Sequence, residues 1–347
     1  MNHLIRNILK VVTVGLISTS MLLTGCQSSE NADPITRSNL KLGTLVGITI
    51  HDSQDTQLFN ILFDRLDAIE QHMSLNIKTS EINAINASAG IEPVQVSEDT
   101  FEVIQSSLHY GDLSKGAFDS TIGPLVTLWG IGSDNAKLPS QAEIDTKLPL
   151  IDYNSVILNI EDKTVFLPLQ GMALDLGAIA KGYAADEMYR ILDENKVNSA
   201  VINLGGNILV KGRKVDNTPW RVGVQNPFDT RGAYIGVVSI SDQTVVTSGI
   251  YERFFELDGQ RYHHILNPAT GYPVNNNLAS VTIITSKSID ADAYSTVLFA
   301  SGLEAGLELA NGSNEIMAIF VTKDKKVYVS DGVESIFELS DNNFILQ

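Results

Sequence analysis

In several segments of the chain, apolar residues recur every three or four positions, which is the period of a helix with one buried face. The clearest such segment spans residues 56–73. Its buried face is predicted to comprise Leu58, Ile61, Leu62, Leu66, Ile69 and Met73. Helices are also predicted over residues 97–114, 178–195, 288–301 and 303–311, and a capping box, Ser140-Gln-Ala-Glu143, opens a short helix.

Runs rich in β-branched residues and bounded by turn residues predict strands. One is predicted over residues 40–51, and residues 155–160 and 163–167 form a predicted hairpin. Further strands are predicted at 199–203, 207–211, 220–225, 233–240, 243–247, 252–257, 261–265, 316–322 and 326–330. Strands follow one another with helices inserted in groups, so we expect an α+β domain with largely antiparallel sheets packed with helices.

The N-terminus has the pattern of an export signal. Basic Arg6 and Lys10 precede an apolar run that is shorter than the roughly 20 residues needed to span a bilayer. The segment ending Leu23-Thr-Gly-Cys26 resembles a bacterial lipobox, in which the cysteine is lipidated. We therefore expect a signal peptide over residues 1–25 and a lipid anchor on Cys26, the only cysteine of the chain.

Residues 26–39 are polar and lack periodicity, which predicts a flexible tether. The rest of the chain shows no internal repeat and no second linker, so one continuous domain over residues 40–347 is expected. The formal charge of −17 becomes −19 when residues 1–25 are removed, which argues against nucleic acid as a partner. A ligand that carries phosphate would need local cations, backbone amides or a metal ion.

Two glycine-containing segments are candidates for holding such a ligand. Between residues 173 and 186, Gly177 and Gly182 permit close backbone approach, and Lys181 offers a cation at a predicted helix start. Residues 203–207, Asn-Leu-Gly-Gly-Asn, allow a similar approach at a strand end. Each is equally compatible with an ordinary structural role, as a glycine-bounded helix or a turn.

Asp292 and Thr296 lie four residues apart on a predicted helix and so share one face. A carboxylate and a hydroxyl are oxygen ligands that suit magnesium, which needs few protein ligands. The alternative is that the acidic residues here are solvated and merely favour the helix dipole.

A pair of histidines, His263 and His264, ends a predicted strand. Neighbouring residues of a strand point to opposite faces, so only one of them is expected to face a given pocket. That histidine could accept a proton from an attacking hydroxyl, or it could be a hydrogen-bonded structural residue. A zinc site is disfavoured, because the histidines have no well-spaced second partner.

These motifs, in this order behind a lipobox, resemble the ApbE family of FAD:protein FMN transferases over residues 42–320. The segments that carry the resemblance are Gly43-Thr44, Met73-Ser74, Ser80-Glu81-Ile82, Asn86, Gly116-Ala-Phe-Asp-Ser-Thr121, Trp129-Gly130, Leu174 to Tyr183, Asn203-Leu-Gly-Gly206, Thr247-Ser-Gly249, His264-Ile-Leu-Asn-Pro-Ala-Thr-Gly271 and Ala291 to Thr296. Leu42 stands where the family has methionine, and Leu75-Asn76 replaces an aromatic residue common after Met-Ser.

The resemblance implies roles for individual residues. Asp292, Thr296 and the backbone carbonyl of Ala178 correspond to Mg²⁺ ligands, and His264 corresponds to the family's histidine, here the candidate base. The positions expected to contact FAD are Leu42, Ala117, Phe118, Asp119, Asp175, Lys181 and Ile265.

The activity implied is transfer of FMN from FAD to a Ser or Thr hydroxyl of a target protein, with release of AMP. Targets resemble membrane redox subunits that carry Asp-x-x-Ser/Thr-Gly-Ala-Ser/Thr, a stretch absent here, so a separate partner is expected. The expected location is the periplasmic side of the inner membrane, with the outer membrane as the alternative. Alternative functions are an Mg²⁺-dependent FAD pyrophosphatase and a non-catalytic FAD-binding lipoprotein.

Overall fold

The computed structural model describes residues 33–347, so the predicted signal peptide and Cys26 lie outside the described residues. A nine-stranded sheet forms the centre, and all of its neighbouring strands are antiparallel except β15 and β17. In spatial order its strands are β1 Ile35–Lys41, β2 Thr44–Ile50, β6 Ser199–Leu204, β7 Asn207–Gly212, β10 Gln243–Gly249, β13 Leu278–Thr285, β14 Met317–Thr322, β15 Lys326–Val329 and β17 Ile345–Leu346. This arrangement confirms the predicted α+β class.

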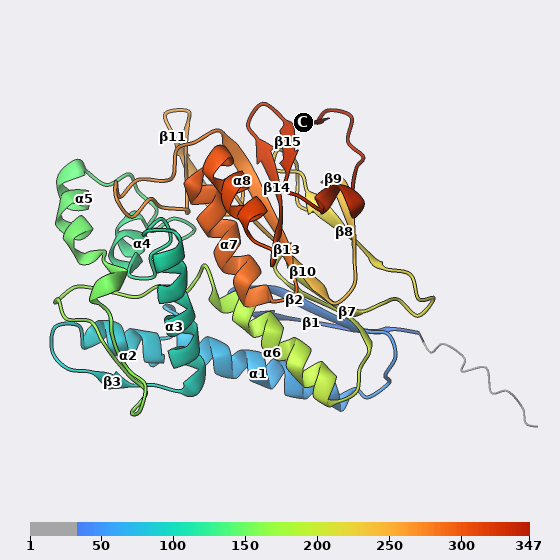
Figure 1. The fold of residues 1–347 in the computed structure, drawn as a ribbon. Helices are drawn as coiled ribbons and strands as arrows, with labels where there is room; N and C mark the ends of the chain where they lie inside the picture. The colour runs from blue at the N-terminus through green and yellow to red at the C-terminus, as the bar shows by residue number, and fades with distance from the viewer. Residues whose placement is uncertain (1–32) are drawn as a thin grey trace, which may run out of the picture.

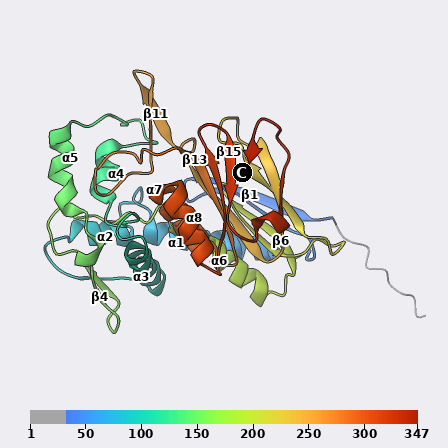
Figure 2. The ribbon, with the colours of Figure 1, turned by 45° about the horizontal axis from the view of Figure 1, so that its top comes forward.

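Three smaller sheets surround the central one. Their strands are β16 Phe337–Leu339, β9 Tyr234–Ile240 and β8 Trp220–Gln225; β3 Val94–Gln95, β5 Thr164–Phe166 and β4 Ile157–Asn159; and the hairpin of β11 Phe254–Leu257 and β12 Gln260–His263. Strands β4 and β5 pair as the predicted hairpin. Figure 2 shows the β11–β12 hairpin standing away from the main sheet.

Helices gather on one face of the central sheet, where α1, α6 and α7 pack together (Figure 1). The helices are α1 Gln57–Met73, α2 Glu81–Ala87, α3 Glu98–Leu113, α4 Gly123–Trp129, α5 Gln141–Lys147, α6 Ala180–Glu194, α7 Ser288–Ser301 and α8 Leu303–Gly312, with short 3-10 turns η1 Leu148–Leu150, η2 Tyr153–Ser155 and η3 Val333–Ser335. The predicted capping box at Ser140 is present at the start of α5.

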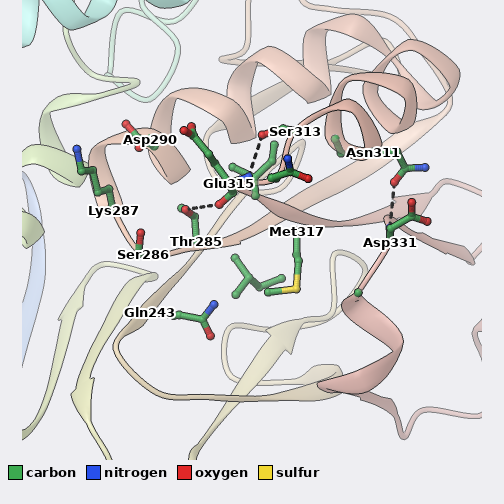
Figure 3. A pocket seen from close by; sticks show the side chains of 15 residues that line it. Gln243, Thr285, Ser286, Lys287, Asp290, Asn311, Ser313, Glu315, Met317 and Asp331 are labelled. Atoms are coloured by element: carbon green, nitrogen blue, oxygen red, sulfur yellow. Dashed lines mark hydrogen bonds between the residues drawn. The ribbon is translucent and has the colours of Figure 1, made fainter.

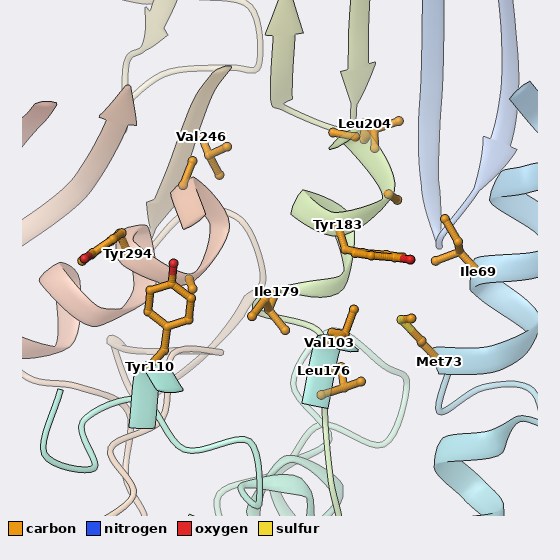
Figure 4. Packing of buried hydrophobic residues seen from close by; sticks show 14 of the residues in the cluster. Ile69, Met73, Val103, Tyr110, Leu176, Ile179, Tyr183, Leu204, Val246 and Tyr294 are labelled. Atoms are coloured by element: carbon orange, nitrogen blue, oxygen red, sulfur yellow. The ribbon is translucent and has the colours of Figure 1, made fainter. Parts of the chain in front are cut away.

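Two hydrophobic cores lie on opposite faces of the central sheet. The main core joins the helices to the sheet, and Figure 4 shows part of it, including Ile69, Met73, Leu176, Ile179 and Tyr183. The second core lies between the central sheet and the sheet of β8, β9 and β16. Within residues 33–347, no helix has the length and apolar character that crossing a membrane would require.

The structure corrects the predicted start of the domain. Strand β1 begins at Ile35, inside the predicted tether, and the strand predicted over residues 40–51 is in fact the hairpin of β1 and β2. Its turn falls at Leu42 and Gly43, which both have a positive φ. The five inner residues of β1 are exposed, so this edge strand has no apolar alternation to detect in the sequence.

Three further elements and one residue of α1 also differ from the predictions. Strand β13 was not predicted, because all eight of its residues are buried and a fully buried strand shows no alternation. The short helices α2 and α4 were also not predicted. On α1, the prediction for Ile61 was wrong: its side chain is 51% exposed, and Phe59 is buried instead.

Candidate active site

The carboxylate of Asp292 lies where the N-terminal turn of α6 meets α7. Its Oδ2 accepts a hydrogen bond of 2.9 Å from the backbone N–H of Gly182, and its Oδ1 lies 3.3 Å from Nζ of Lys181. Asp292 is only 4% exposed. The first N–H groups of a helix have no partner within the helix, and they favour a negative charge. The structure therefore joins two motifs that lie about a hundred residues apart in the sequence.

Two further oxygens expected at this site come from Thr296 and Ala178. Helix α7 confirms that Thr296 lies one turn beyond Asp292 on the same face, and its side chain is partly exposed. Ala178 precedes α6, and the Gly182 N–H that lies four residues later donates to Asp292 instead of to the Ala178 carbonyl. A carboxylate, a hydroxyl and a carbonyl form a donor set that fits Mg²⁺.

This donor set differs from that of a transition-metal centre. No group of three or more His, Cys, Asp or Glu side chains suited to a metal ion occurs in the described part of the chain. Such clusters are typical of zinc sites, whereas Mg²⁺ binds through one or two carboxylates together with water and substrate phosphates.

His264 directly follows β12. It is hydrogen-bonded to the backbone of Arg253, which directly precedes β11 in the same hairpin. Its Nδ1 lies 3.3 Å from the Arg253 carbonyl oxygen, which also accepts the His264 backbone N–H at 3.1 Å. A neutral ring that donates from Nδ1 keeps Nε2 free as a proton acceptor. Burial, together with the positive charges of Arg253 and Lys181, lowers the pKa of His264 to about 3.

The neighbouring His263 has a different environment. It is 5% exposed, its Nε2 donates to the Val274 carbonyl oxygen at 2.9 Å, and its ring meets the edge of Phe299. Burial lowers its pKa to about 4. His263 is thus a neutral core residue, which leaves His264 as the histidine available for chemistry.

Asp175 connects the segment before α6 with the segment around residues 117–121. Its backbone N–H donates to the Ser120 carbonyl at 2.8 Å, and its Oδ1 accepts from the Gly177 N–H at 2.7 Å. Burial raises the pKa of Asp175, and the positive charge of Arg253 opposes this shift. Two segments that are expected to contact FAD therefore lie side by side.

Within the second of these segments, the side chain of Asp119 serves the fold. Its Oδ1 accepts from the backbone N–H and hydroxyl of Thr121 at 2.7 and 2.6 Å, and its Oδ2 accepts from the Tyr153 N–H at 3.1 Å. Phe118 is 4% exposed and Ala117 is half-buried. The proposed FAD contacts of all three stay predictions.

Leu42 and Ile265 lie at other places in the fold. Leu42 occupies the turn between β1 and β2, where its N–H donates to Oε2 of Glu70 on α1 at 2.9 Å. Ile265 is 5% exposed and belongs to the main core. The roles of both residues toward FAD stay predictions.

Arg253 is a residue at this site that sequence reasoning did not identify. Its side chain is exposed and its charge acts on both His264 and Asp175. Its aliphatic stem lies over Gly132, where an added Cβ would come within 3.0 Å of Cδ. Only the pairing of β11 with β12 brings Arg253 to His264, so no local sequence pattern marks it.

Two surface hollows lie near the Asn-Leu-Gly-Gly turn and near the start of α7, respectively. One of about 210 Å³ is lined by Gln225, Arg231, Tyr251 and Glu252, and Arg231 donates to the Gly205 carbonyl at 3.3 Å. It thus borders the Asn-Leu-Gly-Gly turn.

The larger hollow, of about 770 Å³, lies between the start of α7 and the end of α8 (Figure 3). Asp290 lines it and accepts a hydrogen bond from the Tyr110 hydroxyl at 2.7 Å. Asp290 and Asp292 are two residues apart on a helix, so they point in directions about 200° apart. This hollow is therefore separate from the Asp292 site.

The chain is similar to proteins of known families and structures. The sequence profile of the ApbE family matches residues 42–320. A relative from Klebsiella pneumoniae, named FAD:protein FMN transferase, is 41% identical over 292 residues, which cover 84% of this chain and 90% of the relative. The crystal structure of the ApbE protein from Thermotoga maritima has 31% identity and a TM-score of 0.80, covering 88% of this chain and 99% of that one. The flavin transferase ApbE from Vibrio cholerae has 28% identity and a TM-score of 0.79, with coverage of 88% and 99%. The profile match and these relatives show that the chain belongs to the ApbE family.

Proposed function

We propose that this chain transfers FMN from FAD to a Ser or Thr hydroxyl of a target protein and releases AMP. The membership in the ApbE family and the names of its relatives support this activity. The observation that carries the proposal is the position of Asp292, a buried carboxylate at the start of α6 with Lys181 beside it and Thr296 on the same helix face.

The bound metal would be Mg²⁺, held by Asp292, Thr296 and the Ala178 carbonyl. When bound, it would polarise the phosphoryl oxygens of FAD and reduce the charge that develops on AMP. A protein with a formal charge of −17 needs such local positive charge to hold a diphosphate. Lys181 and the positive end of the α6 helix dipole add to it.

His264 is the proposed general base. The acceptor oxygen attacks the phosphorus on the FMN side, a new P–O bond forms, and the P–O bond to AMP breaks. The hydroxyl proton moves to Nε2 of His264, while Nδ1–H stays on the Arg253 carbonyl. An anionic diphosphate nearby would offset the cations that depress the pKa of His264 and so make it a stronger base.

The proposed location is the periplasmic side of the inner membrane, with a lipid anchor on Cys26. The lipobox-like sequence at Cys26 supports the anchor. The proposed partners are flavoprotein subunits of membrane redox complexes that carry Asp-x-x-Ser/Thr-Gly-Ala-Ser/Thr. A membrane anchor would keep the enzyme close to such partners.

The test is to incubate the purified protein with FAD, Mg²⁺ and a domain that carries the target sequence. Mass spectrometry should show the target heavier by one FMN. Asp292→Ala should slow this reaction by on the order of 10³-fold, because a metal contact contributes several kcal/mol. Asp290→Ala, on the opposite side of α7, is the matched control and should retain the wild-type rate.

Other outcomes identify the alternatives. Free FMN with an unmodified target would overturn the transferase in favour of an FAD pyrophosphatase. FAD that stays intact with Mg²⁺ and target present would indicate a non-catalytic flavin-binding protein.

A further inference from the structure

The N-terminal turns of α6 and α7 make an unusually close backbone contact at Gly182. A Cβ added to Gly182 would lie 2.2 Å from the Ser288 carbonyl oxygen and 2.6 Å from Cα of Ile289. Any side chain at this position would therefore force the two helices apart. This contact fixes how far α7, and with it Asp292, lies from the start of α6.

Each of the two helices is capped by a carboxylate from the other. Asp292 of α7 accepts the Gly182 N–H, while Asp186 of α6 accepts the N–H groups of Ser288 and Ile289 at 2.7 and 2.8 Å. The residues in the usual capping positions, Ile179 and Lys287, provide no side-chain cap. The amides of Gly182, Ser288 and Ile289 are thus satisfied across the helix pair.

The first turn of α7 is also tied to the central sheet. The Ser288 hydroxyl donates to Oδ1 of Asn207 at 2.8 Å and lies 3.1 Å from the Thr244 hydroxyl. Asp186 accepts the backbone of the same residue from the other side. Ser288 is therefore held between β7 and β10 on one side and α6 on the other, one turn before Asp292.

We propose that Asp186 is a positioning residue for the Asp292 metal site, holding the first turn of α7 so that the Asp292 carboxylate stays at the start of α6. This inference rests on the proposed function, since it assigns Asp186 a role toward Mg²⁺. Asp186 itself contacts backbone amides of α7 and needs no contact with metal or substrate. Partners that orient a metal ligand are worth about 10- to 100-fold in metal affinity.

The test measures Mn²⁺ binding to the full protein by the electron paramagnetic resonance signal of free Mn²⁺, which prefers the same oxygen ligands as Mg²⁺. Asp186→Asn keeps the volume and one acceptor oxygen but turns an NH₂ group toward an α7 amide. We expect it to weaken Mn²⁺ binding by about 10- to 100-fold. Saturating Mg²⁺ should then restore most of kcat, as for a defect in metal affinity.

Asp186→Glu guards against a variant that fails to fold, because it keeps the charge and both acceptor oxygens on a longer stem. It should bind Mn²⁺ with an affinity between those of wild type and Asp186→Asn. The matched control is Asp52→Asn, because Asp52 also accepts two successive backbone N–H groups, those of Asn198 and Ser199, at the end of β6 opposite the Asn-Leu-Gly-Gly turn. It should lower Tm and leave Mn²⁺ affinity unchanged.

Two results would overturn the inference alone: wild-type Mn²⁺ affinity in Asp186→Asn, or an equal loss of affinity in Asp52→Asn. If wild-type protein binds no Mn²⁺, or if Asp292→Ala binds it as well as wild type, the metal site of the proposed function is wrong and the inference falls with it.

Discussion

The two faces of the central sheet are built from different kinds of residue. On the helix side, the Thr244 hydroxyl of β10 meets Ser288 of α7, and the carboxylates of Asp186 and Asp292 lie between the helices. On the other side, the neighbouring Val245 packs into the second core with β8 and β9. Burying polar groups costs free energy unless each is hydrogen-bonded. Hydrogen bonds among these hydroxyls, carboxylates and amides offset that cost on the face where the chemistry is proposed, while the second core contributes stability.

On the helix side of the sheet, the largest effect on activity is expected from replacing the candidate base, His264. His264→Gln should lower the rate of FMN transfer by about 10²–10⁴-fold, the usual contribution of a general base. FAD binding, followed by flavin fluorescence, should stay close to wild type, because the cations and amides remain. A variant that transfers FMN at the wild-type rate would exclude His264 as the base.

Substitutions at two neighbouring residues of β13, one in each core, compare the two faces of the central sheet directly. Ile284 belongs to the second core and Ile283 to the main core, and both are fully buried. Either change to Ala should lower the free energy of unfolding by about 2–5 kcal/mol in denaturant titrations. Only Ile283→Ala should also reduce kcat/KM, because Ile283 supports the helix side. Equal losses of activity in both variants would contradict the separation of the two faces.

The smallest expected effect is the change of folding stability with pH. The pKa values of His263 and His264 are lowered to about 4 and about 3, so below pH 6.5 the unfolded chain binds protons that the folded chain does not. Stability should therefore fall on acidification from pH 6.5 to 5, by up to about 1.4 kcal/mol per pH unit for each histidine. Asp186, with a pKa raised to about 6, opposes this change, because it takes up a proton in the folded state first.

Denaturant titrations at several pH values measure this slope. His263→Gln should make it shallower by the share of one histidine. An identical slope in the variant and in wild type would show that His263 does not stay neutral in the folded protein over this range.

Local patterns were sufficient where neighbouring residues determine the structure. The apolar period predicted α1, the capping box at Ser140 predicted the start of α5, and the four-residue spacing placed Thr296 on the face of Asp292. Patterns failed for the edge strand β1, which has no buried face, and for β13, which is buried on both. In both cases the alternation that marks a strand is absent.

The sequence by itself determined most of the helices and strands, the α+β class and the residue types available for chemistry. Only the tertiary structure decided that Asp292 meets Gly182 and Lys181, that Asp186 caps α7, and that His263 is buried with its ring bonded to Val274. The physical reason is the separation along the sequence of the residues that each interaction joins. Helical period and capping depend on residues a few positions apart, whereas these contacts depend on sheet register and on how closely two helices pack.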